Sequence, residues 1–122
     1  MPDRDILNYM VKLESHEALF SALANGTRRS MLDRLRSGPR TISDLAGPFD
    51  MSLVAVSKHV HVLEDAGLVR IRREGRSRLC HLDPEPFRDG LRWMARFASF
   101  WQDELDQIER FLEAPANPRR SE

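Results

Sequence analysis

The chain has 122 residues, of which 41% are hydrophobic and 31% charged, and its formal net charge at pH 7 is zero. This length suits one globular domain and excludes a separate catalytic domain beside it. No apolar run approaches the ~20 residues that span a bilayer, and the acidic start MPDRD lacks the features of a signal peptide. A single cysteine, Cys80, excludes an internal disulfide framework. We therefore expect a cytoplasmic protein with no membrane partner.

The first part of the chain favours helices. Residues 5–24 contain no proline and carry apolar side chains at helical spacing, which predicts one long helix or two short ones. Asn25 and Gly26 interrupt this segment, and either Asn25 or Thr27 is suited to cap a second helix through TRRSMLDRLRS. The packing face of that helix is expected to consist of Met31, Leu32 and Leu35.

Two further helices are predicted within residues 41–66. Thr41, with Asp44 three residues later, resembles a capping box and opens a short helix. Ser52 is suited to cap the next helix, which ends just before Gly67, a residue typical of a left-handed C-cap. This pair forms a helix-turn-helix whose turn is expected to be filled by Phe49 and Met51. The packing stripe of its second helix is expected to consist of Val56, Val60 and Leu63, with His59 beside them.

In residues 68–82 the spacing of the apolar side chains changes from helical to alternating. Val69 and Ile71 alternate with arginines, and the alternation resumes after Glu74, which predicts two strands joined by a tight turn. A helix with a polar outer face followed by a basic hairpin is the layout of a winged helix-turn-helix, a mainly α (α+β) fold with a two-stranded β wing. The basic side chains of this wing are Arg70, Arg72, Arg73, Arg76 and Arg78.

A long C-terminal helix is predicted after the wing. The prolines near Glu85 suit a helix start, and apolar residues then recur in three- and four-residue steps to about Leu112. A helix of this length would reach roughly 40 Å, longer than so small a domain can cover, so we expect a second copy of the chain to cover part of it. The alternative is that its aromatic residues only complete the core of a monomer. The predicted dimer interface, to which the first helix contributes, consists of Leu91, Met94, Trp101, Leu105 and Ile108.

Four stretches of the sequence carry a family resemblance. SLVAVSKHVHVLEDAGLV and RREGRSRLCHL look like the recognition helix and wing of the arsenic-repressor (ArsR/SmtB) family. The resemblance extends upstream to LFSALANGTRRSMLDRL and downstream to LDPEPFRDGLRWM, so it covers most of the chain. Gly26 stands where the family usually has proline, which would loosen that turn slightly. We expect residues 1–113 to form one domain, followed by a disordered tail over residues 114–122.

The zero net charge hides a division along the chain. From Arg28 to His81 there are 11 basic and 6 acidic residues, a net charge of +5, and the remainder has 8 basic and 13 acidic residues. Phosphate groups respond to the local field within a Debye length of ~8 Å, so a basic middle segment suits nucleic acid. For any single charge, a solvated surface position is the simpler explanation.

Motifs for catalysis, cofactors and metals are missing from the sequence. There is no Gly-rich phosphate loop, zincin motif or CxxC pair, so we expect neither an enzyme nor a cofactor. Members of the resembled family that sense metals use cysteines in the first helix of the helix-turn-helix, or His and acidic ligands along the last helix. Here TISDLAG has no cysteine and the last helix has neither His nor Cys, which predicts no metal site.

A few residues remain that suit other kinds of site. Cys80 would suit a bridge between subunits, but on a wing strand it is better interpreted as a small packing residue. His59 is interpreted as a core residue with a polar partner rather than as a metal ligand. The carboxylates that would suit a hard cation, and that we interpret as a solvated face, are Asp103, Glu104, Asp106 and Glu109.

Two functions fit these observations. The first is a homodimeric repressor that binds a palindromic site in double-stranded DNA, and the second is an interaction module of the same fold that no longer binds DNA. Donors on the outer face of the recognition helix and at the wing favour the repressor, whose effector the sequence does not name. The residues expected to face the major groove are Ser52, Val54, Ser57, Lys58 and His61. Those expected to hold phosphates are Arg76, Arg78, Arg28 and Thr41.

Overall fold

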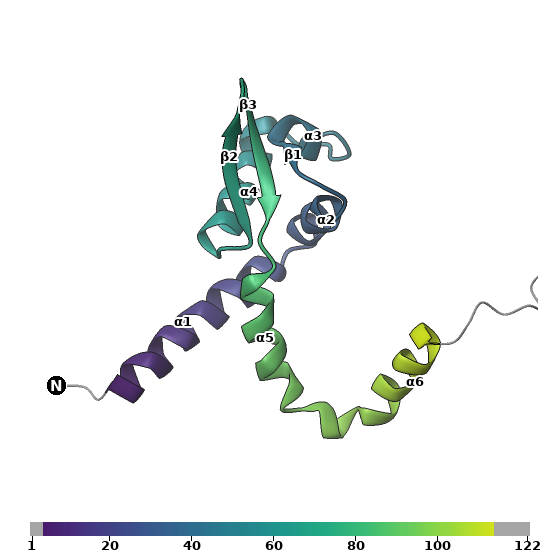
Figure 1. The fold of residues 1–122 in the computed structure, drawn as a ribbon. Helices are drawn as coiled ribbons and strands as arrows, with labels where there is room; N and C mark the ends of the chain where they lie inside the picture. The colour runs from purple at the N-terminus through teal and green to yellow at the C-terminus, as the bar shows by residue number, and fades with distance from the viewer. Residues whose placement is uncertain (1–3, 114–122) are drawn as a thin grey trace, which may run out of the picture. The chain divides into compact units, whose positions relative to one another are not determined.

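The structure is a computed structural model that describes residues 4–113, and the predicted disordered tail over residues 114–122 lies outside these. The chain divides into two compact units, Met1–Gly90 and Leu91–Glu122, and the prediction of one domain over residues 1–113 stays a prediction. The elements in chain order are α1 (Arg4–Leu23), α2 (Gly26–Leu35), β1 (Arg40–Thr41), α3 (Ile42–Ala46), α4 (Leu53–Asp65), β2 (Val69–Glu74), β3 (Ser77–Leu82), α5 (Glu85–Ala95), a 3-10 turn η1 (Ala98–Phe100) and α6 (Gln102–Glu113) (Figure 1).

Side-chain caps start the helices around the helix-turn-helix. The Asn25 side chain accepts a hydrogen bond from the backbone N–H of Arg28 at 3.0 Å. Of the two candidates for the cap of α2, Asn25 is therefore the one that caps it. The predicted caps of α3 and α4 are confirmed, since Thr41 Oγ1 and Ser52 Oγ each accept a backbone N–H bond at 3.1 Å. α4 ends just before Gly67, as predicted, and the φ of Gly67 is +78°, a conformation that favours glycine.

The wing is a β-hairpin, as predicted. β2 and β3 pair antiparallel from Val69 opposite Leu82 to Glu74 opposite Ser77, and Gly75, with φ +62°, opens the two-residue loop. The sheet has a third strand that was not predicted, because β1 pairs with β3 through only two residues and shows no alternation. This short pairing ties the start of α3 to the base of the wing.

The core lies within the first unit, where the three helices around the helix-turn-helix meet the wing. The predicted packing faces of α2 and α4 are confirmed, and Phe49 and Met51 pack against this core as expected. Cys80 is fully buried, which agrees with its interpretation as a packing residue. The buried side chains are those of Leu19, Ala22, Met31, Leu32, Leu35, Leu45, Val56, Val60, Leu63, Leu68, Val69 and Cys80.

α1 is a single long helix, the first of the two alternatives predicted over residues 5–24, but only its last turns are buried. Leu19 and Ala22 lie in the core, whereas Ile6, Met10 and Leu13 are exposed. Gly90 of α5 is buried against this end of α1, and a Cβ atom there would collide with the side chain of Leu19. A larger residue at this position would therefore force the Leu19 side chain to shift where the two helices approach each other. Within residues 4–113, no helix has the length and apolar character needed to cross a membrane.

The C-terminal segment is helical, as predicted, but the expected continuity to Leu112 is wrong. α5 ends at Ala95, and the N–H of Phe97 bonds to the carbonyl of Met94 at 3.0 Å, a contact of the tighter i to i+3 type. Trp101, with φ −139°, then leaves the helical conformation before α6 begins. Aromatic residues and serine have lower helix propensity than Ala or Leu, and their cluster here favours a break. The spacing of the hydrophobic residues gives no sign of this lower helix propensity.

Candidate nucleic-acid interface

The outer face of α4 is accessible to solvent at most of the positions predicted to meet DNA. Three buried apolar residues fix the rotation of the helix, so that its opposite side faces solvent. Val54 is 66% exposed, Lys58 is exposed and Ser57 is half-buried. The side chain of His61 is 60% exposed, and its Nδ1 lies 3.4 Å from Oε1 of Glu64, a long contact. These side chains therefore belong to one accessible surface.

The two capping hydroxyls lie at the starts of α3 and α4. Ser52 and Thr41 each use an oxygen lone pair to accept a backbone N–H bond. A hydroxyl group has a hydrogen to donate as well, so each side chain is able to cap its helix and donate to an external oxygen. The helix-turn-helix thus presents two positioned donors beside the face of α4.

The alternation of the wing divides its arginines between two faces. Arg73 and Arg78 are cross-strand neighbours on the same face as buried Cys80 and half-buried Ile71. They line a crevice of about 340 Å³ whose other wall is formed by His61 and Glu64 of α4. The crevice therefore joins the predicted base-reading helix to the predicted phosphate-binding wing. Arg73 was not among the predicted site residues, although its position two residues after Ile71 indicates this face.

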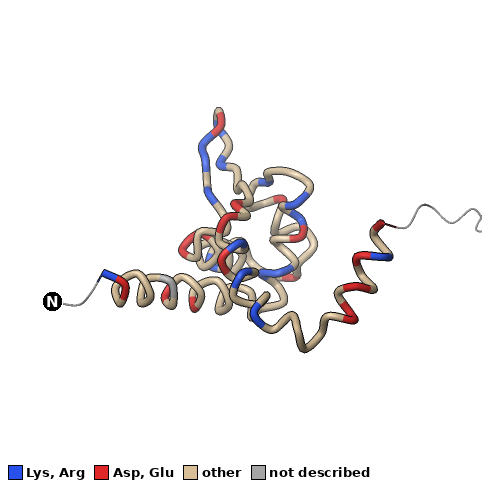
Figure 2. Tube along the Cα trace, turned by 60° about the horizontal axis from the view of Figure 1, so that its bottom comes forward, with Lys and Arg blue, Asp and Glu red and all other residues tan. Residues whose placement is uncertain are grey.

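The positive charge of the wing is largely uncompensated. Figure 2 shows basic residues along both strands of the hairpin. Within residues 4–113, no ion pair or side-chain hydrogen bond is formed by Arg72, Arg73, Arg76, Arg78 or Lys58. Arg70 is different, because its Nε lies 2.9 Å from Oδ2 of Asp83 at the base of the wing. The unpaired cations are available for an external anion.

Arg28 differs from the unpaired arginines of the wing, because its guanidinium forms hydrogen bonds within the protein. Its Nε donates to the carbonyl of Ala22 at 2.8 Å, and its Nη2 donates to that of Ser21 at 3.0 Å. Its Nη1 lies 3.3 Å from Nδ1 of His59, which is half-buried on α4. His59 thus has a polar partner within the fold, as predicted. The guanidinium of Arg28 joins the end of α1 to α4.

Comparison with known proteins identifies the family of this chain. A helix-turn-helix domain family matches residues 23–72. The transcriptional repressor SdpR of Bacillus subtilis is 30% identical over 87 residues, which cover 71% of this chain and 97% of SdpR. The crystal structure of the ArsR family transcriptional regulator RHA00566 is 45% identical, with a TM-score of 0.67, and the match covers 73% of this chain and 92% of that one. This chain belongs to the ArsR family.

The fold also agrees with that of a second solved protein, described as a possible ArsR-family transcriptional regulator. The homodimeric winged helix-turn-helix DNA-binding domain Mb0332 from Mycobacterium bovis, solved by NMR, is 28% identical with a TM-score of 0.60. The match covers 80% of this chain and 89% of that domain. The chain is therefore a transcriptional regulator with a winged helix-turn-helix DNA-binding domain, and its family is one of regulators rather than enzymes.

In this ArsR-family chain the predicted dimer residues carry much exposed apolar surface. Leu91 is 66% exposed and Ile108 is 55% exposed, Met94 is also exposed, and Trp101 and Leu105 are half-buried. In the first unit, α1 likewise exposes apolar side chains along its first turns. Exposed apolar surface of this extent favours a protein contact.

The residues suited to metal binding or thiol chemistry are dispersed or buried. Within residues 4–113, no three His, Cys, Asp or Glu side chains gather as a metal site would require. Burial raises the pKa of the Cys80 thiol, and the negative charge of Glu64 raises it further. The thiolate form that would react or bind a soft metal is therefore disfavoured at neutral pH.

Proposed function

We propose that this chain is a homodimeric repressor that acts in the cytoplasm and binds an approximately two-fold symmetric DNA operator. The observation that carries the proposal is the continuity between the open face of α4 and the unpaired arginines of the wing. The name of SdpR, a transcriptional repressor, and the homodimeric state of Mb0332 support the finer points of repression and dimer formation.

In this proposal the outer face of α4 reads bases in the major groove. Lys58 and His61 donate to guanine acceptors or phosphates, and Val54 contacts a thymine methyl group. Ser57 and Ser52 donate from the same side of the helix. These five residues carry the sequence preference, because they are the side chains that approach base edges.

The wing and the start of α3 hold the DNA backbone. Arg76 at the wing turn and Arg78 on β3 bind phosphates, and Thr41 donates through its hydroxyl. We add Arg73 to this group, because it lines the same crevice as Arg78 and His61 and makes no internal ion pair. We remove Arg28 from it, because its guanidinium is engaged by Ser21, Ala22 and His59.

The dimer forms through the apolar residues of α1 and of the C-terminal helices. A two-fold axis between subunits relates their two α4 helices, so the half-sites lie about one helical turn apart, roughly 34 Å. The two breaks around η1 do not remove the stripe, since each helix keeps an apolar face of its own. Covering these faces removes exposed apolar surface from water.

Selection of DNA from random pools by the purified protein tests this function. We expect selected fragments to contain an inverted repeat that binds at least a thousandfold more tightly than scrambled DNA, with affinity that falls steeply as salt rises. Arg88→Ala is a suitable control, since Arg88 is exposed on α5 and forms only a surface ion pair with Glu85. A protein that shows no salt-sensitive binding to any DNA would instead be an interaction module.

A further inference from the structure

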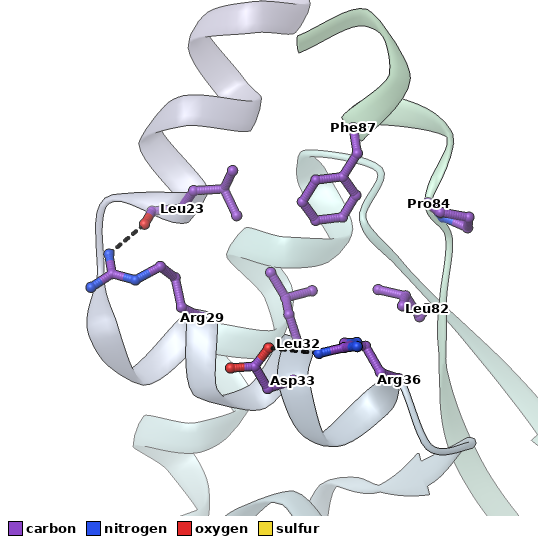
Figure 3. Close-up of a pocket in the computed structure, with 8 residues that line it drawn as sticks. All are labelled: Leu23, Arg29, Leu32, Asp33, Arg36, Leu82, Pro84 and Phe87. Atoms are coloured by element: carbon purple, nitrogen blue, oxygen red, sulfur yellow. Dashed lines mark hydrogen bonds and ion pairs between the residues drawn. The ribbon is translucent and has the colours of Figure 1, made fainter. Parts of the chain in front are cut away.

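A second concave site lies in the first unit, away from the recognition helix and wing. It is a pocket of about 470 Å³ between the end of α1, one side of α2 and the link from β3 to α5. Its walls are formed by Leu23, Leu32, Leu82 and Phe87, whose side chains point toward one another in Figure 3. This volume falls within the range of about 300–1,000 Å³ that is usual for small-molecule sites.

The polar groups of the pocket are charged and lie on α2 and on its C-cap residue, Arg36. Arg29 donates from Nη1 to the carbonyl of Leu23 at 2.7 Å, which holds its guanidinium beside the opening. Arg36 is paired only with Asp33, at 3.9 Å, and both side chains are more than 70% exposed. A contact this long and exposed is weak, so Arg36 is able to turn toward another anion at little cost. The two arginines and one aspartate leave a net positive charge.

We propose that this pocket binds an organic anion that has an apolar body and a single carboxylate. The walls formed by Leu32, Leu82 and Phe87 favour an apolar ligand body over a sugar or a nucleotide base, because these side chains offer no hydrogen-bond partner to polar groups. The arginines attract a carboxylate and hold it at the opening, where it stays partly hydrated. An alkyl or aryl body then fills the space between Leu32 and Phe87.

The position of the pocket couples it to the DNA-binding surface. α2 carries Arg28, which contacts His59 of α4, and Arg34, whose Nη2 donates to the carbonyl of Asp44 in α3 at 3.0 Å. A bound ligand contacts α2 and the start of α5 together, so it favours the arrangement of these two elements in which the pocket fits it. This regulatory step rests on the proposed function, whereas the binding site itself does not.

Calorimetry without DNA tests the binding site, using octanoate and its uncharged analogue octanamide. We expect one octanoate per chain, with octanamide at least tenfold weaker because it lacks the charge. Arg36→Ala should weaken octanoate binding about fivefold, whereas Arg88→Ala, which removes another exposed arginine outside the pocket, should not change it. Equal affinities for the two probes, or no effect of Arg36→Ala, would overturn the proposal.

The location of the ligand is checked by NMR methyl shifts on the wild-type protein. We expect octanoate to shift the methyl signals of Leu23, Leu32 and Leu82 and to leave those of Ile6 and Ile108 unchanged. Shifts confined to the exposed apolar faces would show nonspecific amphiphile binding and would refute the site. This measurement does not depend on whether any variant folds.

The regulatory step is tested by titrating octanoate into the complex with a selected DNA fragment. We expect the DNA affinity to change at least fivefold, and Arg36→Ala should require about fivefold more octanoate for the same effect. Octanoate that binds in calorimetry but leaves DNA affinity unchanged would refute the regulation and keep the site. A protein that binds no DNA would refute the proposed function, while calorimetry would still decide on the pocket.

Discussion

Nη1 of Arg28 lies 3.3 Å from Nδ1 of His59, and this contact joins α2 to the recognition helix. The same guanidinium donates to two carbonyls at the end of α1, so one side chain connects three helices of the first unit. We infer that Arg28, with three acceptors within its own fold, contributes to stability rather than to phosphate binding.

Replacing Arg28 with alanine should therefore lower the free energy of unfolding by about 1–3 kcal/mol, because two carbonyls and a histidine nitrogen lose a charged donor. Urea denaturation measures the effect, with Arg36→Ala as the control, since an exposed arginine should change stability by less than about 0.5 kcal/mol. The salt dependence of DNA binding should not change. A slope reduced as much as in Arg76→Ala would show that Arg28 contacts phosphate after all.

The wing and the recognition helix should differ in how their loss affects DNA affinity. Arg76→Ala should weaken binding to all sequences similarly and reduce the salt slope by about one unit per subunit. His61→Ala should cost about 1–3 kcal/mol on the selected site and little on scrambled DNA. Electrophoretic shifts at several salt concentrations separate the two effects, with Arg88→Ala as the control. Equal losses on both DNAs for both variants would refute this division.

The apolar stripe of α6 should hold the dimer. Leu105→Asp places a charge in the surface that we expect the second copy to cover, at a cost of several kcal/mol that dissociation relieves. Light scattering should show a monomer for this variant and a dimer for wild type at micromolar concentration. Gln107→Asp introduces the same charge on the opposite side of the helix and should remain dimeric. A monomeric wild type would contradict the predicted interface.

Metal ions should not control this protein. Zinc, cobalt, cadmium and arsenite should bind weakly and leave DNA bound, because the segments that carry metal ligands in other family members lack His and Cys here. Calorimetry with zinc measures this directly. Stoichiometric submicromolar binding that His→Ala changes abolish would reveal a site assembled across subunits.

The buried thiol of Cys80 should make the protein less stable at alkaline pH. Its pKa is raised in the folded state, so its contribution to stability is complete below the ordinary thiol pKa of about 8.5 and is lost as pH rises through the folded pKa. Urea denaturation between neutral and alkaline pH should show a smaller loss for Cys80→Ala, which retains every other titrating group. Identical losses for both proteins would contradict this.

Much of the fold followed from local patterns in the sequence. The caps of α3 and α4, the end of α4 before Gly67 and the buried stripe of Val56, Val60 and Leu63 each depend on residues within a few positions of one another. Such interactions are nearly independent of the rest of the chain, because helix geometry alone brings these groups together. The hairpin followed for the same reason, from alternation and a turn of two residues.

The tertiary structure decided what depends on distant partners. The role of Arg28 was invisible in the sequence, since one of its acceptors lies 31 positions away on α4. Arg73 belongs to the candidate site because β2 packs beside α4. β1 is a strand only because its two residues pair with β3. To predict the break at Phe97, the low helix propensity of the residues there would have had to be weighed against a strong apolar pattern. A side chain's function depends on which groups come within its reach, and folding, not spacing, determines those distances.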